Sequence, residues 1–127
     1  VPMVNQLLKN PDHLVLGSPE AEVIPELGPE PEDLDSVRLH GMSPFYGTDL
    51  DPMLRSLGVS TVIATGVSLN VGILGLVIEA LNRGHEVVLV KDCVTGYPAE
   101  YAERVLEHSL ARITTQTTAE ALLELWR

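Results

Sequence analysis

Hydrophobic and polar positions form a regular pattern only in the second part of the chain. Residues 1–35 are irregular and hold six of the nine prolines, each of which restricts its own backbone and that of its predecessor. We expect this segment to be a loop-rich entry. It has room for a brief strand at residues 14–16 and for a short helix capped by Ser18 that ends before Pro25.

From residue 36 onward, runs of β-branched residues alternate with runs of helical spacing. The expected strands cover residues 36–40, 60–65, 86–91 and 112–115. The expected helices cover residues 49–57 with Thr48 as the N-cap, 71–82, 99–110, and a last segment from Thr117 or Thr118 to about Trp126. The apolar runs STVIAT and EVVLVK predict strands that are buried on both faces.

This alternation predicts an α/β fold in which a parallel sheet lies between helices. Ligands of open parallel sheets bind beyond the carboxyl ends of the strands. The pattern therefore places a binding site among three loops, at residues 40–45, 65–70 and 92–98.

Composition narrows the choice of partners. The length of 127 residues indicates one domain, and the formal net charge of −10 argues against nucleic acid. No apolar run reaches the roughly 18 residues of a membrane span. The single cysteine, Cys93, excludes an internal disulfide and fits a cytoplasmic location. Prolines interleave the acidic stretch at residues 26–35 and the histidines lack ligand spacing, so we expect no metal and no cofactor.

Three motifs stand in the expected loops and in a fixed order: SPFYGTDLD at residues 43–51, TGVSLNVG at 65–72, and NRGHEVVLVKDCVTGYP at 82–98. This series resembles the isochorismatase-like hydrolase superfamily, which includes isochorismatase, nicotinamidase and N-carbamoylsarcosine amidohydrolase. The resemblance implies a three-layer, Rossmann-like α/β/α fold. It makes residues 1–127 one isochorismatase-like domain that corresponds to the C-terminal two thirds of the family fold.

The resemblance also implies where the site lies. The family's catalytic lysine position falls on Arg38 and its nucleophilic cysteine position on Gly72. A cis peptide bond is implied between Val67 and Ser68, in a turn whose N–H groups would form an oxyanion hole. The residues expected to contact substrate are His40, Phe45, Val67, Ser68 and Asn70.

Glycine at position 72 excludes covalent cysteine chemistry there and leaves two functions open. The first is hydrolysis of a small polar metabolite, either an isochorismate-like vinyl ether or an amide. The second is a catalytically inactive member that serves as a binding or oligomeric scaffold subunit. Homo-oligomers are expected from the resemblance, and the apolar helix at residues 71–80 and Trp126 are candidates for the contact.

Four residues keep two interpretations each. Gly72 permits close helix packing or leaves a cavity for substrate, and Arg38 forms a surface or interface ion pair or binds an anion. His40 is a hydrogen-bonding residue of the pocket or a solvated loop residue. Cys93 is expected to be a buried, inert thiol, with a displaced nucleophile as the lesser alternative.

The family's first two strands, and the aspartate at the end of the first, have no counterpart in residues 1–127. Without them the segment at residues 36–40 would lose its link to the strand at 60–65, whose apolar edge would be exposed. Either the sequence is a fragment, which we favour, or the remaining strands pair directly, or another chain supplies the missing strands.

Overall fold

The computed structural model describes residues 5, 8–13 and 15–127, which divide into two units, residues 1–35 and 36–127. The described part of the first unit consists mainly of turns and irregular backbone, with helical residues at positions 5, 8 and 9 and a short 3-10 helix, η1 (Pro25–Leu27). The expected helix after Ser18 is wrong, because the Ser18 carbonyl accepts only a turn bond from Ala21 N–H, at 2.9 Å. Of the expected strand at 14–16, Leu14 lies outside the described residues, and Val15 and Leu16 are not in a strand.

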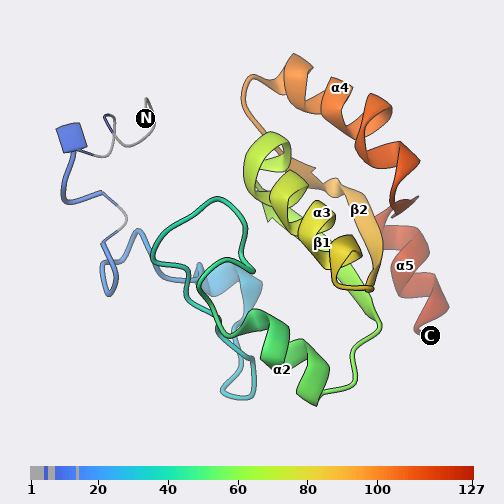
Figure 1. Ribbon diagram of the computed structural model, residues 1–127, viewed down its shortest axis with the longest axis horizontal. Coiled ribbons are helices and arrows are strands. Elements are labelled where there is room, and N and C mark those ends of the chain that lie inside the picture. Colours follow the sequence, from blue (N-terminus) through green and yellow to red (C-terminus); the bar gives the residue numbers. More distant parts are fainter. Residues whose placement is uncertain (1–4, 6–7, 14) are drawn as a thin grey trace. The chain divides into compact units, whose positions relative to one another are not determined.

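The second unit is built on a parallel sheet of three strands (Figure 1). The strands are β1 (Thr61–Val67), β2 (Glu86–Thr95) and β3 (Thr115–Thr117), in the order β1-β2-β3. The first two confirm the expected strands at 60–65 and 86–91. The third begins later than expected because Leu110–Arg112 form a 3-10 helix, η3, directly after the preceding α-helix.

The expected strand at residues 36–40 does not form. These residues are extended or bent without any strand pairing, and most of them are exposed. An extended segment becomes a strand only when a neighbour satisfies its N–H and C=O groups, and the described residues supply none here.

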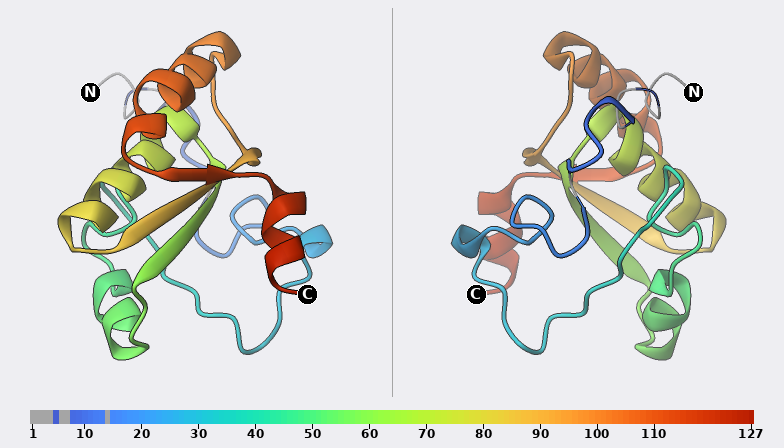
Figure 2. Two further views of the ribbon diagram at one scale, coloured as in Figure 1. Left: turned by 90° about the vertical axis from the view of Figure 1, so that its right-hand side faces the viewer. Right: turned by 90° about the vertical axis from the view of Figure 1, so that its left-hand side faces the viewer.

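Helices cover both faces of the sheet. The α-helices are α2 (Leu50–Ser56), α3 (Leu74–Asn82), α4 (Ala99–His108) and α5 (Ala119–Leu125), and a π-helical turn, η2 (Leu69–Ile73), leads directly into α3. Helices α3 and α4 lie on one face and α5 lies on the other (Figure 2). The cap of α5 was predicted: the Thr118 hydroxyl accepts from Ala121 N–H, at 3.3 Å. The result is the expected three-layer α/β arrangement.

The core lies between the sheet and the α3–α4 layer. Its buried apolar residues are Phe45, Ala64, Leu69, Ile73, Val77, Ala80, Val87, Leu89, Ala102, Val105 and Leu110. Strand β2 is buried on both faces as expected, since Val87 and Leu89 face this core while Val90 is also buried. The same expectation is wrong for β1, in which only Ala64 is buried, because β1 lies at the edge of the sheet.

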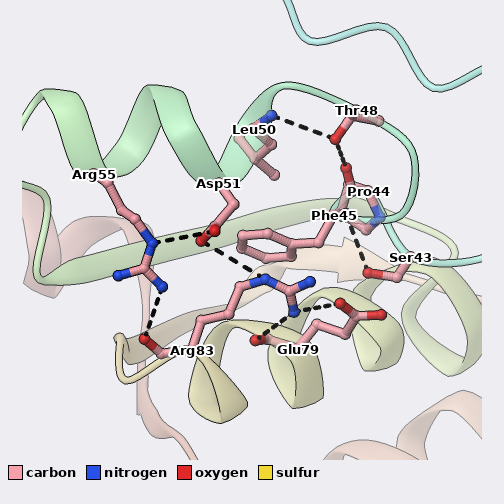
Figure 3. A network of polar contacts seen from close by, with 9 residues as sticks. All are labelled: Ser43, Pro44, Phe45, Thr48, Leu50, Asp51, Arg55, Glu79 and Arg83. Atoms are coloured by element: carbon pink, nitrogen blue, oxygen red, sulfur yellow. Dashed lines mark hydrogen bonds and ion pairs between the residues drawn. The ribbon is translucent and has the colours of Figure 1, made fainter.

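Phe45 fixes α2 and the preceding loop onto the end of α3 (Figure 3). The Arg83 guanidinium lies 4.7 Å from the centre of the Phe45 ring and binds the Glu79 carboxylate. Asp51 of α2 lies 3.7 Å from Arg83 and accepts from Arg55 at 3.1 Å. Ion pairs that are this exposed stabilise by at most about 1 kcal/mol each, so the buried phenyl ring contributes more.

The outer side of α5 carries exposed apolar residues near the end of the chain. Leu125 is 81% exposed and Trp126 is 66% exposed. Within the described residues, no helix combines the length and the apolar character that crossing a membrane requires.

Candidate active site

A break in the pairing of β1 with β2 joins two of the expected loops. Ala64 pairs with Leu89, but Gly66 pairs with Val94, so residues 90–93 bulge opposite Thr65 alone. Beyond the bulge, Val67 pairs with Thr95. The loops that follow β1 and β2 therefore leave the sheet side by side, as the sequence predicts for the carboxyl ends of neighbouring parallel strands.

The turn after β1 has the backbone that the resemblance implies. The Val67–Ser68 peptide bond is cis. The Ser68 carbonyl then accepts from both Val71 N–H, at 3.2 Å, and Ile73 N–H, at 3.0 Å, which starts the π-helical turn. Position 72 thus lies in the first turn of a helix that continues into α3.

Space is available beside Gly72. A Cβ atom built on it would meet only the Val67 carbonyl oxygen, at 3.7 Å, which is an ordinary van der Waals distance. The φ angle of Gly72 is not in the left-handed region. Neither close packing nor backbone conformation requires glycine here, so the structure favours the open space over the packing interpretation.

Asn70 makes hydrogen bonds inside the site. Its Oδ1 accepts from the Ser68 hydroxyl at 2.9 Å, and its Nδ2 donates to the Tyr97 carbonyl at 3.1 Å. Sequence reasoning gave Asn70 a role in substrate binding and did not single out Tyr97. The order of motifs carried no signal for this bond, because it uses a main-chain oxygen and joins residues 27 positions apart.

The other predicted residues make their contacts outside the polar network of this turn. Arg38 is exposed and donates to the Met42 carbonyl at 2.6 Å. His40 is exposed and packs edge-on against Tyr46, with ring centres 5.4 Å apart. Phe45 is buried in the core, which leaves its ring no free face for substrate. Among the described residues, no ion pair or hydrogen bond joins Arg38 or His40 to residues 67–72.

An open hollow of about 450 Å³ lies along α3, beyond Gly72. Its walls come from the loop before α2 and from the exposed side of α3: Gly41, Met42, Ser43, Tyr46, Gly75, Ile78 and Glu79. Ser68, Asn70 and Gly72 do not line it. The predicted site residues are therefore divided between the turn and the neighbourhood of this hollow.

Cys93 lies in the bulge of β2 and is exposed, so the expectation of a buried thiol is wrong. The bulge interrupts the pairing of residues 90–93 with β1, and such a break changes the direction in which a side chain points. Its neighbour Asp92 accepts from Ala119 N–H at the start of α5, at 2.9 Å and 3.2 Å. In the part of the chain that the structure describes, no group of three or more His, Cys, Asp or Glu side chains could hold a metal ion.

A family model of the Isochorismatase domain matches residues 3–121. The chain belongs to the isochorismatase family. Among solved isochorismatase-family structures, an isochorismatase-like hydrolase from Alkaliphilus metalliredigens is 29% identical, with a TM-score of 0.82 over 89% of this chain and 62% of that one. The fold and the family expected from the sequence are both confirmed.

Curated isochorismatase-family relatives are longer than this chain. The uncharacterized isochorismatase family protein YwoC of Bacillus subtilis is 32% identical over 82% of this chain and 54% of its own length. The ureidoacrylate amidohydrolase RutB of Methylorubrum extorquens is 31% identical over 96% of this chain and 48% of its own length. The chain thus spans about half the length of these relatives.

Proposed function

We propose that the chain carries the substrate-binding turn of an isochorismatase-family hydrolase that cleaves a small polar metabolite without a covalent cysteine at position 72. The observation that carries the proposal is the unfilled space beside Gly72, in the first turn of a helix. A glycine that neither packing nor φ demands leaves room for part of a substrate. Similarity to RutB, a ureidoacrylate amidohydrolase, supports an amide or ureido substrate, and a vinyl ether is the alternative.

Chemistry at this turn depends on the backbone and on water. The first N–H groups of a helix lack intrahelical partners, and such donors stabilise an oxyanion or an anionic substrate group. With no side chain at position 72, bond cleavage needs a water molecule or a proton donor from elsewhere. Arg38 is proposed to orient an anionic group, as a guanidinium fork binds a carboxylate in two-point fashion.

Alkylation separates this proposal from cysteine catalysis. The full-length gene product is assayed on isochorismate and on a ureido amide, before and after treatment with iodoacetamide. We expect hydrolysis that survives alkylation, because position 72 carries no thiol and the proposed reaction uses none; within residues 1–127 the reagent can modify only Cys93. Cys93→Ser is the control. Loss of activity on alkylation of the native protein, together with an inactive Cys93→Ser variant, would contradict the proposal and make Cys93 the reacting group. An active Cys93→Ser variant that resists alkylation would mean only that the alkyl group on Cys93 obstructs the site.

A second candidate is a binding subunit without turnover. It is favoured by Arg38 and Gly72 together, because the resemblance implies a catalytic lysine and a catalytic cysteine at these positions and the chain has neither there. The turn before Gly72 nevertheless keeps the implied cis peptide bond. Isothermal titration calorimetry with the same two compounds tests this candidate. Saturable binding without hydrolysis, both in the native protein and in Cys93→Ser, would support it. The double change Arg38→Lys with Gly72→Cys then tests for a latent site through its thiol reactivity.

A further inference from the structure

The Asn70 side chain bridges the two loops that leave the sheet at the proposed site. The Tyr97 carbonyl oxygen only accepts, so the Asn70 amide nitrogen must face it, and the amide oxygen is left for the Ser68 hydroxyl. The last strand pair is Val67 with Thr95. Asn70 therefore extends the connection between β1 and β2 beyond the point at which strand pairing stops.

Gly96 packs against this bridge. A Cβ on Gly96 would overlap Asn70 Oδ1, and it would lie 3.0 Å from the Ala102 Cβ and 3.3 Å from the Leu69 nitrogen. Its φ angle is not in the left-handed region, so backbone conformation does not explain the glycine. The absence of a side chain at position 96 is what lets the Asn70 amide reach Tyr97.

We propose that Asn70 is a positioning residue that, with Gly96, fixes the backbone of the turn on which Gly72 lies. Gly72 is two residues beyond Asn70, and the nearest atom to its missing Cβ is the Val67 carbonyl oxygen at the other end of the same turn. Releasing the amide from Tyr97 frees the turn to move against β2. The proposal rests on the proposed function, because the turn matters to catalysis only if substrate binds beside Gly72.

A thiol placed at position 72 reports on this geometry without any substrate. Gly72→Cys is made together with Cys93→Ser, so that the introduced thiol is the only one, and the rate of its alkylation by iodoacetamide is measured against pH. A thiol at a helix N-terminus has a pKa below the usual value of about 8.5. The midpoint of the pH profile therefore depends on how the turn holds position 72 relative to the helix.

In this background, Asn70→Ala is expected to move the midpoint toward the usual value by about 0.5 pH unit or more, since the effect of a helix terminus falls off within its first turn. Gly96→Ala is expected to move it in the same direction by displacing the Asn70 amide. Tyr97→Phe is the matched control: its side chain is 88% exposed and the change keeps the carbonyl, so the midpoint should not move.

An unchanged profile in Asn70→Ala overturns the proposal, and so does a Tyr97→Phe shift as large as that of Asn70→Ala. Circular dichroism checks that each variant is folded. If Asn70→Ala does not fold, the folded Gly96→Ala decides, with a shift supporting the proposal and an unchanged midpoint overturning it. Because no reading uses hydrolysis, failure of the proposed enzymatic function would show separately, as absent turnover in the native protein.

Discussion

Two glycines near the turn serve opposite purposes. Gly72 borders open space, with its nearest neighbour at van der Waals distance from a built Cβ, whereas Gly96 has no space because the Asn70 amide and Ala102 occupy it. Both positions hold glycine, but only at position 96 does packing require it. The consequence of adding one methyl group should therefore differ in sign between the two positions.

We expect Gly72→Ala to leave the free energy of unfolding unchanged or to raise it by up to about 1 kcal/mol, because alanine is the better residue in a helix. Gly96→Ala should lower it by about 1–3 kcal/mol, as overpacking of a filled site does. Urea denaturation followed by circular dichroism measures both. A Gly96→Ala variant as stable as the native protein would show that the crowding around Gly96 relaxes without cost.

The residues of the turn could be predicted from sequence, but their contacts could not. The order of motifs placed Val67, Ser68 and Asn70 in the loop after the first buried strand and Gly72 at the start of the following helix. In the structure Val67 ends β1, and Asn70 and Gly72 lie in the π-helical turn η2. The sequence did not predict the hydrogen bond from the Asn70 amide to the Tyr97 carbonyl, because every residue type has a main-chain carbonyl and the type at position 97 therefore does not indicate it. The motif around Phe45 predicts a contact with substrate, whereas the structure buries the phenyl ring in the core.

The main strands and helices expected from the sequence formed where another element was present to pair or pack with them. Strand β2 begins at Glu86 as expected but continues to Thr95, and α3 ends at Asn82 as expected but begins at Leu74, because the π-helical turn η2 occupies the residues before it. The segment at residues 36–40 has a strand-like composition and no partner strand, so it stays unpaired. Helix α5 shows the same dependence on a neighbour, since its first turn is bonded to Asp92 of β2 as well as to its own Thr118 cap.

Removing the Asp92 carboxylate should loosen α5. Asp92→Ala leaves Ala119 N–H without its acceptor, and we expect a loss of about 0.5–2 kcal/mol in unfolding free energy, as for other helix caps. Asp92→Asn keeps an acceptor oxygen and should lose less. Chemical denaturation compares the two. A loss in Asp92→Asn as great as that in Asp92→Ala would mean that the charge matters more than the hydrogen bond.

At the scale of the molecule, β1 is an edge strand: within the described residues, no strand pairs with its outer side. Its sequence, TVIATGV, contains no charged residue and no proline, the residue types that normally block strand pairing between molecules. Ile63 is 38% exposed and Val67 is 72% exposed on this strand. An edge of this kind is a template for another strand, whichever polypeptide supplies it.

We therefore expect the 127-residue chain to associate as its concentration rises, and Ile63→Lys to reduce that association because an edge charge disfavours pairing. Light scattering over a concentration series measures the effect. Leu39→Lys is the matched control, since it changes charge equally and replaces an exposed apolar residue that lies in no strand. Equal reduction by both variants would indicate a general effect of charge, with β1 not at the contact.

The exposed end of α5 has a spectroscopic consequence. Trp126 is the only tryptophan in the chain, and its indole is largely in water in the folded protein. Its emission should therefore be at long wavelength before unfolding as well as after, which makes intrinsic fluorescence a poor probe of folding. The same property makes it a sensitive probe of coverage: a shift of the emission to the blue would report that another surface has come to lie on α5.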